Sequence, residues 1–75
     1  FPIKVMGTNA AGFLEAMVEV ARQFDPDFDA ATVESRPSKS ETYLGLTLIV
    51  TATSREQLDA LYRALTSHPM VKVVL

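Results

Sequence analysis

The sequence predicts an α+β fold in which four antiparallel strands form one sheet and two helices cover one of its faces. Three observations lead to this prediction. Hydrophobic patterns follow one another in the order strand, helix, strand, strand, helix, strand. The connections between them are short, and crossover connections in sheets are right-handed as a rule. The first and third strands alternate between apolar and polar residues, as strands with one buried face do. Together these features indicate a ferredoxin-like βαββαβ sandwich, formed as a single domain over residues 1–75.

The length of 75 residues suits one domain and leaves no room for a second. A chain of this size buries only roughly 60% of its unfolded surface, so assembly with a partner would stabilise it. The apolar content of 48% and the mean hydropathy of +0.16 argue against disorder. No apolar run approaches the roughly 20 residues of a membrane helix, and no stretch resembles a signal peptide. We therefore expect no membrane partner.

Cysteine is absent, which excludes disulfides, thiolate catalysis and zinc–thiolate sites. This composition suits a reducing compartment, and we expect a cytoplasmic protein. The net charge of −2 and the pI near 5.2 provide no general attraction to phosphate backbones. We therefore expect no nucleic-acid partner.

The first strand is predicted over residues 1–6, because apolar and polar residues alternate there. One side of this strand carries Phe1, Ile3 and Val5, and the other carries Pro2, Lys4 and Met6. In the turn that follows, Thr8 or Asn9 can cap a helix. Between residues 10 and 24 the apolar side chains fall at helical spacing with charged residues opposite, which predicts an amphipathic helix.

The middle of the chain predicts a loop and a hairpin of two strands. Residues 25–31 contain one proline and three aspartates and predict a loop of solvated acids. Residues 32–36 predict a weak strand, which Pro37 places at a sheet edge or brings to its end. Residues 42–53 predict the longest strand. Its even-numbered residues point one way, and the opposite face carries Tyr43, Gly45, Thr47, Ile49 and Thr51.

The second helix is the best defined element. Ser54 and Gln57 have the spacing of a capping box, and leucines at helical spacing follow them up to Leu65. His68 and Pro69 end this helix, and residues 70–75 predict the last strand.

The predicted strand order across the sheet is 4-1-3-2, which puts the last strand at an edge beside the first. Strict alternation then turns Val71, Val73 and Leu75 toward the helices. The open side carries Met70, Lys72 and Val74, next to Lys4, Met6, Tyr43 and Ile49. This edge is apolar on both faces, with only Lys72 to discourage pairing with another chain, so we interpret it as a contact surface. The alternative is that the strand belongs to the core and a few of its residues are singly exposed.

Three stretches resemble the YbeD-like family of small, largely uncharacterised bacterial cytoplasmic proteins. They are "FPIKVMG" at the start, "RPSKSETYLGLTLIVTATSREQL" in the middle and "SHPMVKVVL" at the end. The closing His-Pro-x-Val with its terminal Val-Leu is the most specific element. The resemblance implies a ferredoxin-like fold similar to ACT regulatory domains, and a protein that is not an enzyme.

The turn at residues 7–12 has the two-glycine spacing of a P-loop and lies between a predicted strand and a predicted helix. A P-loop requires Lys and then Ser or Thr after its second glycine. Phe13 and Leu14 stand at those positions, so we expect no nucleotide site.

The same turn resembles the loop of ACT domains that lines an amino-acid pocket, although Ala11 replaces their usual proline. By this resemblance, the candidate ligands for a small carboxylate are Thr8, Asn9 and Gly12. Exposed amides at a helix start can hold such a group. The alternative is a plain helix-capping turn.

Other motifs fail on their spacing. The acids of residues 25–29 begin like a calcium loop, but Ala30 replaces the required glycine and Arg36 the bidentate glutamate, so we expect no metal. His68 is the only histidine, and helix termination accounts for it better than catalysis does. Arg36 and Lys39 near two serines could catch a phosphate, although a solvated hairpin tip is the default. The aromatic platform of RNA-recognition domains is missing from the open face.

These observations favour a non-catalytic interaction or regulatory module without a cofactor. It would bind another protein, or a second copy of itself, through the open sheet face and the last strand. The alternative is an ACT-like sensor of an amino acid or another small carboxylate, which would use the loop after the first strand.

Overall fold

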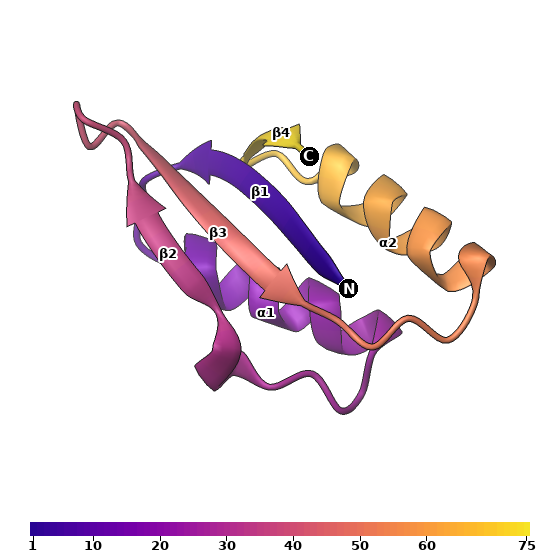
Figure 1. The fold of residues 1–75 in the computed structure, drawn as a ribbon. Coiled ribbons are helices and arrows are strands. Elements are labelled where there is room, and N and C mark those ends of the chain that lie inside the picture. The colour runs from indigo at the N-terminus through magenta and orange to yellow at the C-terminus, as the bar shows by residue number, and fades with distance from the viewer.

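The computed structural model describes residues 1–75 and contains the six predicted elements (Figure 1). Their bounds are β1 (Pro2–Thr8), α1 (Phe13–Phe24), a short 3-10 turn η1 (Ala30–Thr32), β2 (Glu34–Pro37), β3 (Tyr43–Ile49), α2 (Arg55–Ser67) and β4 (Val71–Val74). All neighbouring strands are antiparallel, and their order is β2-β3-β1-β4. This is the predicted order 4-1-3-2 read in reverse, so the ferredoxin-like α+β fold is confirmed.

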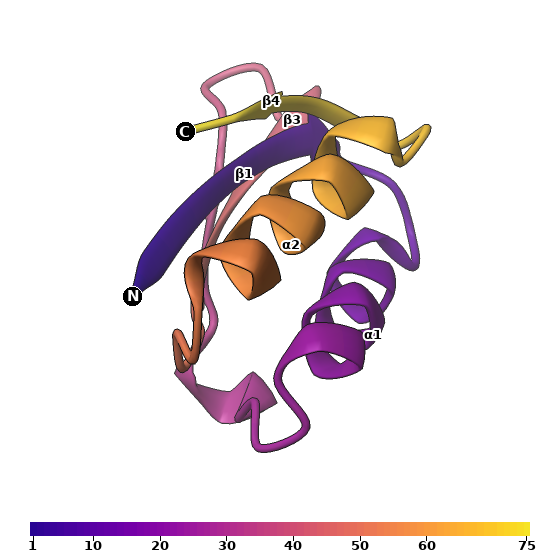
Figure 2. The same cartoon turned by 90° about the vertical axis from the view of Figure 1, so that its right-hand side faces the viewer.

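Both helices lie on the same side of the sheet (Figure 2). Eleven buried apolar residues fill the space between the two layers: Ile3, Val5, Phe13, Met17, Ala21, Phe28, Leu46, Leu48, Val50, Leu61 and Leu65. Nine of them come from alternate positions of β1 and β3 and from the facing stripes of α1 and α2, as the two periodicities require. The other two, Phe28 and Val50, lie in the loops that follow α1 and β3. Neither helix has the length and apolar character that crossing a membrane demands.

β3 ends at Ile49, four residues before the predicted end of this strand. The Val50 amide still donates to the carbonyl of Phe1, but the next amide, of Thr51, donates instead to the buried carboxylate of Asp25. The predicted loop of solvated acids is therefore wrong at two positions, because Asp25 and Phe28 are both buried. Composition alone could not show that this loop folds back on the core.

Helix α1 begins at Phe13, after Gly12 takes a left-handed conformation with φ of +89°. No side chain caps this helix, so the prediction that Thr8 or Asn9 caps it is wrong. Glycine adopts this backbone conformation without the steric cost of a Cβ atom, which accounts for the residue found there.

The capping box of α2 is confirmed. The Gln57 amide donates to Ser54 Oγ at 3.0 Å, and Gln57 Oε1 accepts from the amide of Thr53 at 2.7 Å. The second bond reaches one residue further back than the box requires.

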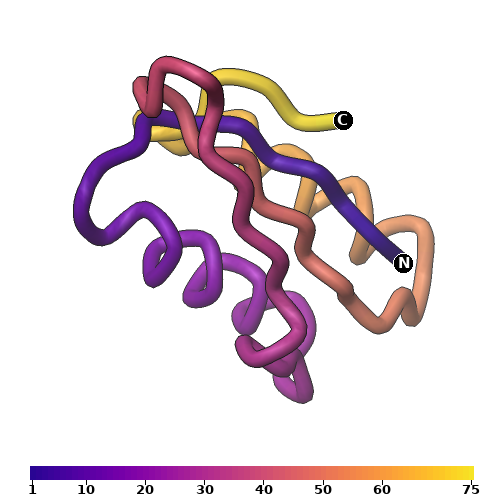
Figure 3. The backbone as a smooth tube through the Cα atoms, turned by 60° about the vertical axis from the view of Figure 1, so that its left-hand side comes forward, coloured from indigo at the N-terminus to yellow at the C-terminus, as the bar shows by residue number.

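Strand β2 is an edge strand, and the hairpin that joins it to β3 extends past the end of β1 (Figure 3). Because the Ser38 amide donates to the carbonyl of Tyr43, Pro37 occupies the position whose nitrogen faces away from the sheet. A proline there loses no ladder bond and blocks pairing with another strand. In the hairpin loop, Glu41 is the one residue other than glycine with a positive φ, at 58°.

Strand β4 contains a bulge that the alternation of its sequence does not reveal. Val73 pairs with Met6 whereas Val71 pairs with Gly7, so Lys72 is an extra residue in the ladder. Beyond the bulge the two faces of the strand are exchanged. Val74 pairs with Val5 and packs on the core, and Val73 lies on the open face.

Gly7 explains why β4 approaches β1 so closely at this point. A Cβ atom at Gly7 would clash with the carbonyl oxygen of Met70 and with the ring of Phe13. The missing side chain allows both groups to pack against β1.

Candidate interaction surface on the open sheet face

The register of the sheet fixes which side chains are neighbours on the face that the helices leave uncovered. Thr47 in β3 lies between Glu34 in β2 and Lys4 in β1. Leu75 continues this row, since it exchanges two backbone hydrogen bonds with Lys4, of 2.7 and 3.3 Å. Residues that pair directly in antiparallel strands project from the same face, so these four side chains form one line across the sheet.

A second row runs parallel to the first and contains Arg36, Gly45, Met6 and Val73. Two further residues of β3 complete the face: Tyr43 opposite Thr8 near the hairpin, and Ile49 opposite Pro2 at the other end. We call the side chains of these two rows, together with Tyr43 and Ile49, the open face.

The open face holds most of the exposed apolar side chains of the molecule. Seven large apolar residues are more than a third exposed, and five of them lie here: Met6 (42%), Tyr43 (40%), Ile49 (44%), Val73 (45%) and Leu75 (74%). Single exposed apolar residues are ordinary on protein surfaces, but a cluster on one face marks a contact surface.

A shallow hollow lies near the centre of this face. Its lining includes Lys4, Met6, Glu34, Arg36, Tyr43, Gly45, Thr47 and Leu75. Gly45 contributes no side chain, which leaves a gap between Tyr43 and Thr47 along β3 and between Arg36 and Met6 across the sheet.

Charge is distributed unevenly between the two sides of the molecule. The strands and the β2–β3 hairpin carry four basic and two acidic side chains. The helices and the loops beside them carry three basic and seven acidic ones. The sheet side of an acidic protein is therefore its more positive side.

The predicted contact residues fall into two groups in the structure. Met6, Tyr43 and Ile49 lie on the open face, and Lys72 is exposed at the bulge. Met70 and Val74 do not belong to this surface, because both are partly buried against the core. That part of the prediction is wrong.

Val73 and Leu75, which the sequence assigned to the helix side, take the place of Met70 and Val74. The bulge at Lys72 explains the exchange of Val73, Val74 and Leu75, because it moves every later residue to the other face. Met70 precedes the bulge and lies in the turn before β4. The close packing of β4 against Gly7 is the one sign of this bulge, and the sequence alone does not show that packing.

The loop predicted to hold a small carboxylate is hydrogen-bonded to the β2–β3 hairpin. Asn9 donates from its amide and from Nδ2 to the carbonyls of Thr42 and Glu41, at 3.0 and 2.8 Å. Thr8 and Gly12 are exposed, and none of the three candidate residues lines either of the two hollows in the surface.

The other motifs also take part in local structure. Ser38 Oγ accepts from the Tyr43 amide and Ser40 Oγ donates to Thr42 Oγ1, so these hydroxyls brace the hairpin tip. His68 Nδ1 accepts from the amide of Met70 at 3.2 Å where α2 turns into β4. No group of three His, Cys, Asp or Glu side chains comes together as a metal site would need.

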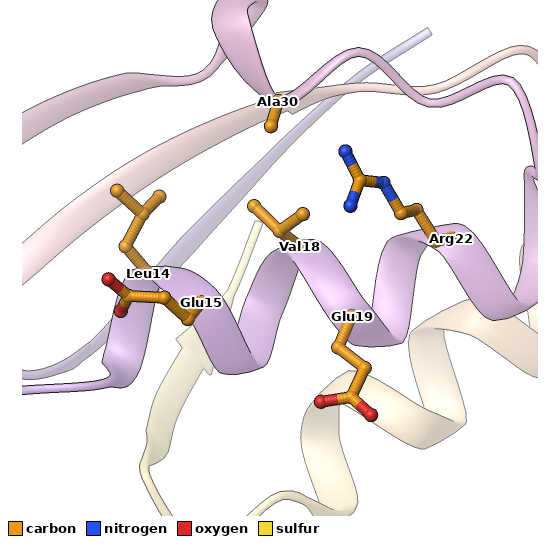
Figure 4. A pocket seen from close by; sticks show the side chains of 6 residues that line it. All are labelled: Leu14, Glu15, Val18, Glu19, Arg22 and Ala30. Atoms are coloured by element: carbon orange, nitrogen blue, oxygen red, sulfur yellow. The ribbon is translucent and has the colours of Figure 1, made fainter.

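A second hollow lies between α1 and the segment that carries Ala30 (Figure 4). Leu14, Val18 and Arg22 point toward Ala30 of the following loop, whereas Glu19 points away from it. The sequence singled out none of these residues as a site. The charged residues of its lining, Glu15, Glu19 and Arg22, are all exposed to solvent.

Comparison with known proteins places the chain among proteins without an assigned activity. The model of the family described as "Protein of unknown function (DUF493)" matches residues 1–75. A UPF0250 protein of Leptothrix cholodnii is 68% identical over the whole chain, which spans 82% of that relative's length. UPF0250 proteins of Ralstonia nicotianae and Bordetella pertussis are 65% and 64% identical over all 75 residues, which span 77% and 82% of their lengths.

Proposed function

The chain belongs to the DUF493 family of proteins of unknown function. We propose that it is a non-catalytic interaction module that binds another protein through its open face. The membership confirms the resemblance to the YbeD-like family of small uncharacterised bacterial proteins. The observation that carries the proposal is the gathering of five of the seven exposed large apolar side chains on that face.

The structure of the two sheet edges favours a partner that contacts the open face over one that pairs with an edge strand. Pro37 blocks β2, and the bulge at Lys72 breaks the regular ladder of β4, which has only four residues. Prolines, bulges, charged residues and short strands are the devices by which proteins prevent strand pairing at sheet edges. A partner that uses the sheet therefore meets side chains rather than a row of free backbone groups.

The polar groups of the fold support a role without catalysis. Asp25 is the one buried charged residue, and both of its carboxylate oxygens accept backbone hydrogen bonds. No buried side-chain nitrogen or oxygen lacks a hydrogen-bond partner. In catalytic triads the histidine Nδ1 is oriented by a carboxylate, whereas His68 Nδ1 accepts from the backbone amide of Met70 in its own turn.

The test is affinity capture from native lysate with three forms of the tagged protein: the wild type, Ile49→Glu and Leu14→Glu. Ile49 lies on the open face and Leu14 on α1, and their exposed fractions are similar, at 44% and 38%. The two variants therefore introduce the same charge at similarly exposed positions, one on the sheet and one on a helix.

We expect a near-stoichiometric partner to be captured by the wild type and Leu14→Glu and to be lost with Ile49→Glu. Retention of that partner by Ile49→Glu, or its loss only with Leu14→Glu, would contradict the proposal. Thermal melting of each variant shows whether a lost partner reflects a lost fold.

A further inference from the structure

We propose that the hollow at Gly45 receives an apolar side chain of a partner segment whose flanking residues are acidic. This inference rests on the proposed function and names the chemistry of the partner. Three properties of the open face carry it: the vacant position in the middle of β3, the positive groups beside that position, and the small area of the face.

The backbone does not require a glycine at position 45. Gly12 is the one glycine with a positive φ, so the conformation of Gly45 is open to other residues. A Cβ atom there would meet only the carbonyl oxygen of Arg36, at 3.4 Å, which is close to ordinary contact. A glycine in a strand interior destabilises the strand by roughly 0.5–1 kcal/mol relative to alanine. Such a glycine often marks the close approach of another molecule.

The groups around the vacant position suit an apolar side chain. Tyr43 and Thr47 flank it along the strand, and Met6 lies beside it on β1. The ring of Tyr43 offers an incoming side chain a large apolar surface, and the flexible thioether of Met6 can adapt to its shape.

The charges beside the hollow favour a partner segment with negative charge. Lys4 and Arg36 flank the hollow on two strands, and Glu34 is the one acidic residue in its lining. The helices and the loops beside them are acidic, so the open face repels an acidic segment less than the helix side does. Opposite charges across an interface accelerate encounter and suppress the wrong partners.

The area of the face suits a segment better than a second copy of the chain. Four strands about 4.8 Å apart, with four to seven residues each, present roughly 400 Å². A stable interface between two folded proteins buries roughly 800 Å² per partner. A single helix or extended segment can span the open face and contact its centre, whereas a dimer built on this face alone would be weak.

The test is selection from a phage-displayed library of random peptides of roughly 12 residues, long enough to cross the sheet as a helix or an extended segment. We expect the selected peptides to share an aromatic or aliphatic residue flanked by Asp or Glu. Binding of synthetic versions should move the amide resonances of Gly45 and its strand neighbours. Their affinity should weaken as salt is added, because exposed charges are screened.

Two variants and one control locate the contact. Gly45→Val fills the hollow, and Arg36→Glu reverses a charge beside it. Arg55→Glu makes the same charge change at an exposed position of α2 and is the control. We expect the dissociation constant to rise about tenfold or more in the first two variants and to stay unchanged in the control. If Gly45→Val fails to fold, a comparison of the dissociation constants of Arg36→Glu and Arg55→Glu still tests the inference.

Each other outcome contradicts the inference in a distinguishable way. Selected peptides that bind the open face without acidic residues would overturn the acidic partner and leave the interaction module standing. Peptides that shift only resonances of α1, or no selected peptide at all, would overturn the inference at Gly45. Concentration-dependent dimers in sedimentation that are lost with Gly45→Val would assign the face to a second copy. The proposed function itself would be overturned by retention of a native partner by Ile49→Glu, or by loss of that partner only with Leu14→Glu.

Discussion

The carboxylate of Asp25 accepts a hydrogen bond of 2.9 Å from the backbone amide of Thr51, which lies 26 residues further along the chain. The carbonyl of Thr51 in turn accepts from Gln57 Nε2 at 3.0 Å, and the same Nε2 donates to the carbonyl of Phe24 at 2.8 Å. These bonds join the end of α1 to the segment between β3 and α2. They replace the water that Asp25 loses on burial, and they account for the end of β3.

Replacing Asp25 with alanine should destabilise the fold by about 1–3 kcal/mol, because the partly buried amide of Thr51 loses its acceptor. Urea denaturation followed by circular dichroism measures this change. Asp27→Ala is the control, since Asp27 is exposed and only its backbone amide contributes to the loop. Equal effects of the two substitutions would show that the carboxylate of Asp25 does not hold the loop.

Replacing Glu41 with asparagine should stabilise the fold by about 0.5–1 kcal/mol, because asparagine tolerates the left-handed conformation that Glu41 adopts at φ of 58°. The backbone carbonyl that accepts from Asn9 is kept. Thermal melting measures the gain, and Lys39→Asn in the same loop should leave the melting temperature unchanged. A melting temperature raised equally by both changes would point to loop composition instead of backbone strain.

The two strand glycines should respond in opposite ways to alanine. Gly7→Ala should destabilise the fold by about 1–3 kcal/mol, since the new methyl group collides with Phe13 and the carbonyl of Met70. Gly45→Ala should leave stability equal or raise it by about 0.5–1 kcal/mol, because its Cβ has room. Chemical denaturation of the pair measures both effects. A loss of stability with Gly45→Ala would mean that the fold, and not a partner, requires this glycine.

The sequence predicted the parts of the fold that depend on local periodicity. Apolar spacing located both helices, and alternation located β1 and β3 and correctly assigned their faces. The order of the strands then followed from short connections and the handedness of crossovers. Gln57 was recognised as part of a cap, but its bonds to Thr51 and Phe24 depend on tertiary contacts that spacing does not contain.

Only part of the open face could be predicted, because part of it depends on tertiary contacts. Met6, Tyr43 and Ile49 lie on strands with strict alternation, so their exposure could be read from the sequence. The residues of β4 could not, because a bulge depends on how two strands meet. Gly45 was visible in the sequence, but its meaning depends on the free space around it, which only the structure shows.

Because of the bulge at Lys72, we predict that the same substitution at two neighbouring valines has different effects on stability. Val74→Glu should destabilise the fold by about 2 kcal/mol or more, because Val74 packs on the core and a charge there loses its water. Val73→Glu should change stability by less than about 0.5 kcal/mol, since this side chain is 45% exposed on the open face.

Urea denaturation of both variants measures the difference. Strict alternation from Val71 would place Val73 on the core and Val74 outside, so the reverse ranking would contradict the bulge. Val73→Glu also adds a negative charge beside Met6 without disturbing the core. It should therefore keep the fold and repel acidic peptides selected against the wild type, which separates loss of binding from loss of structure.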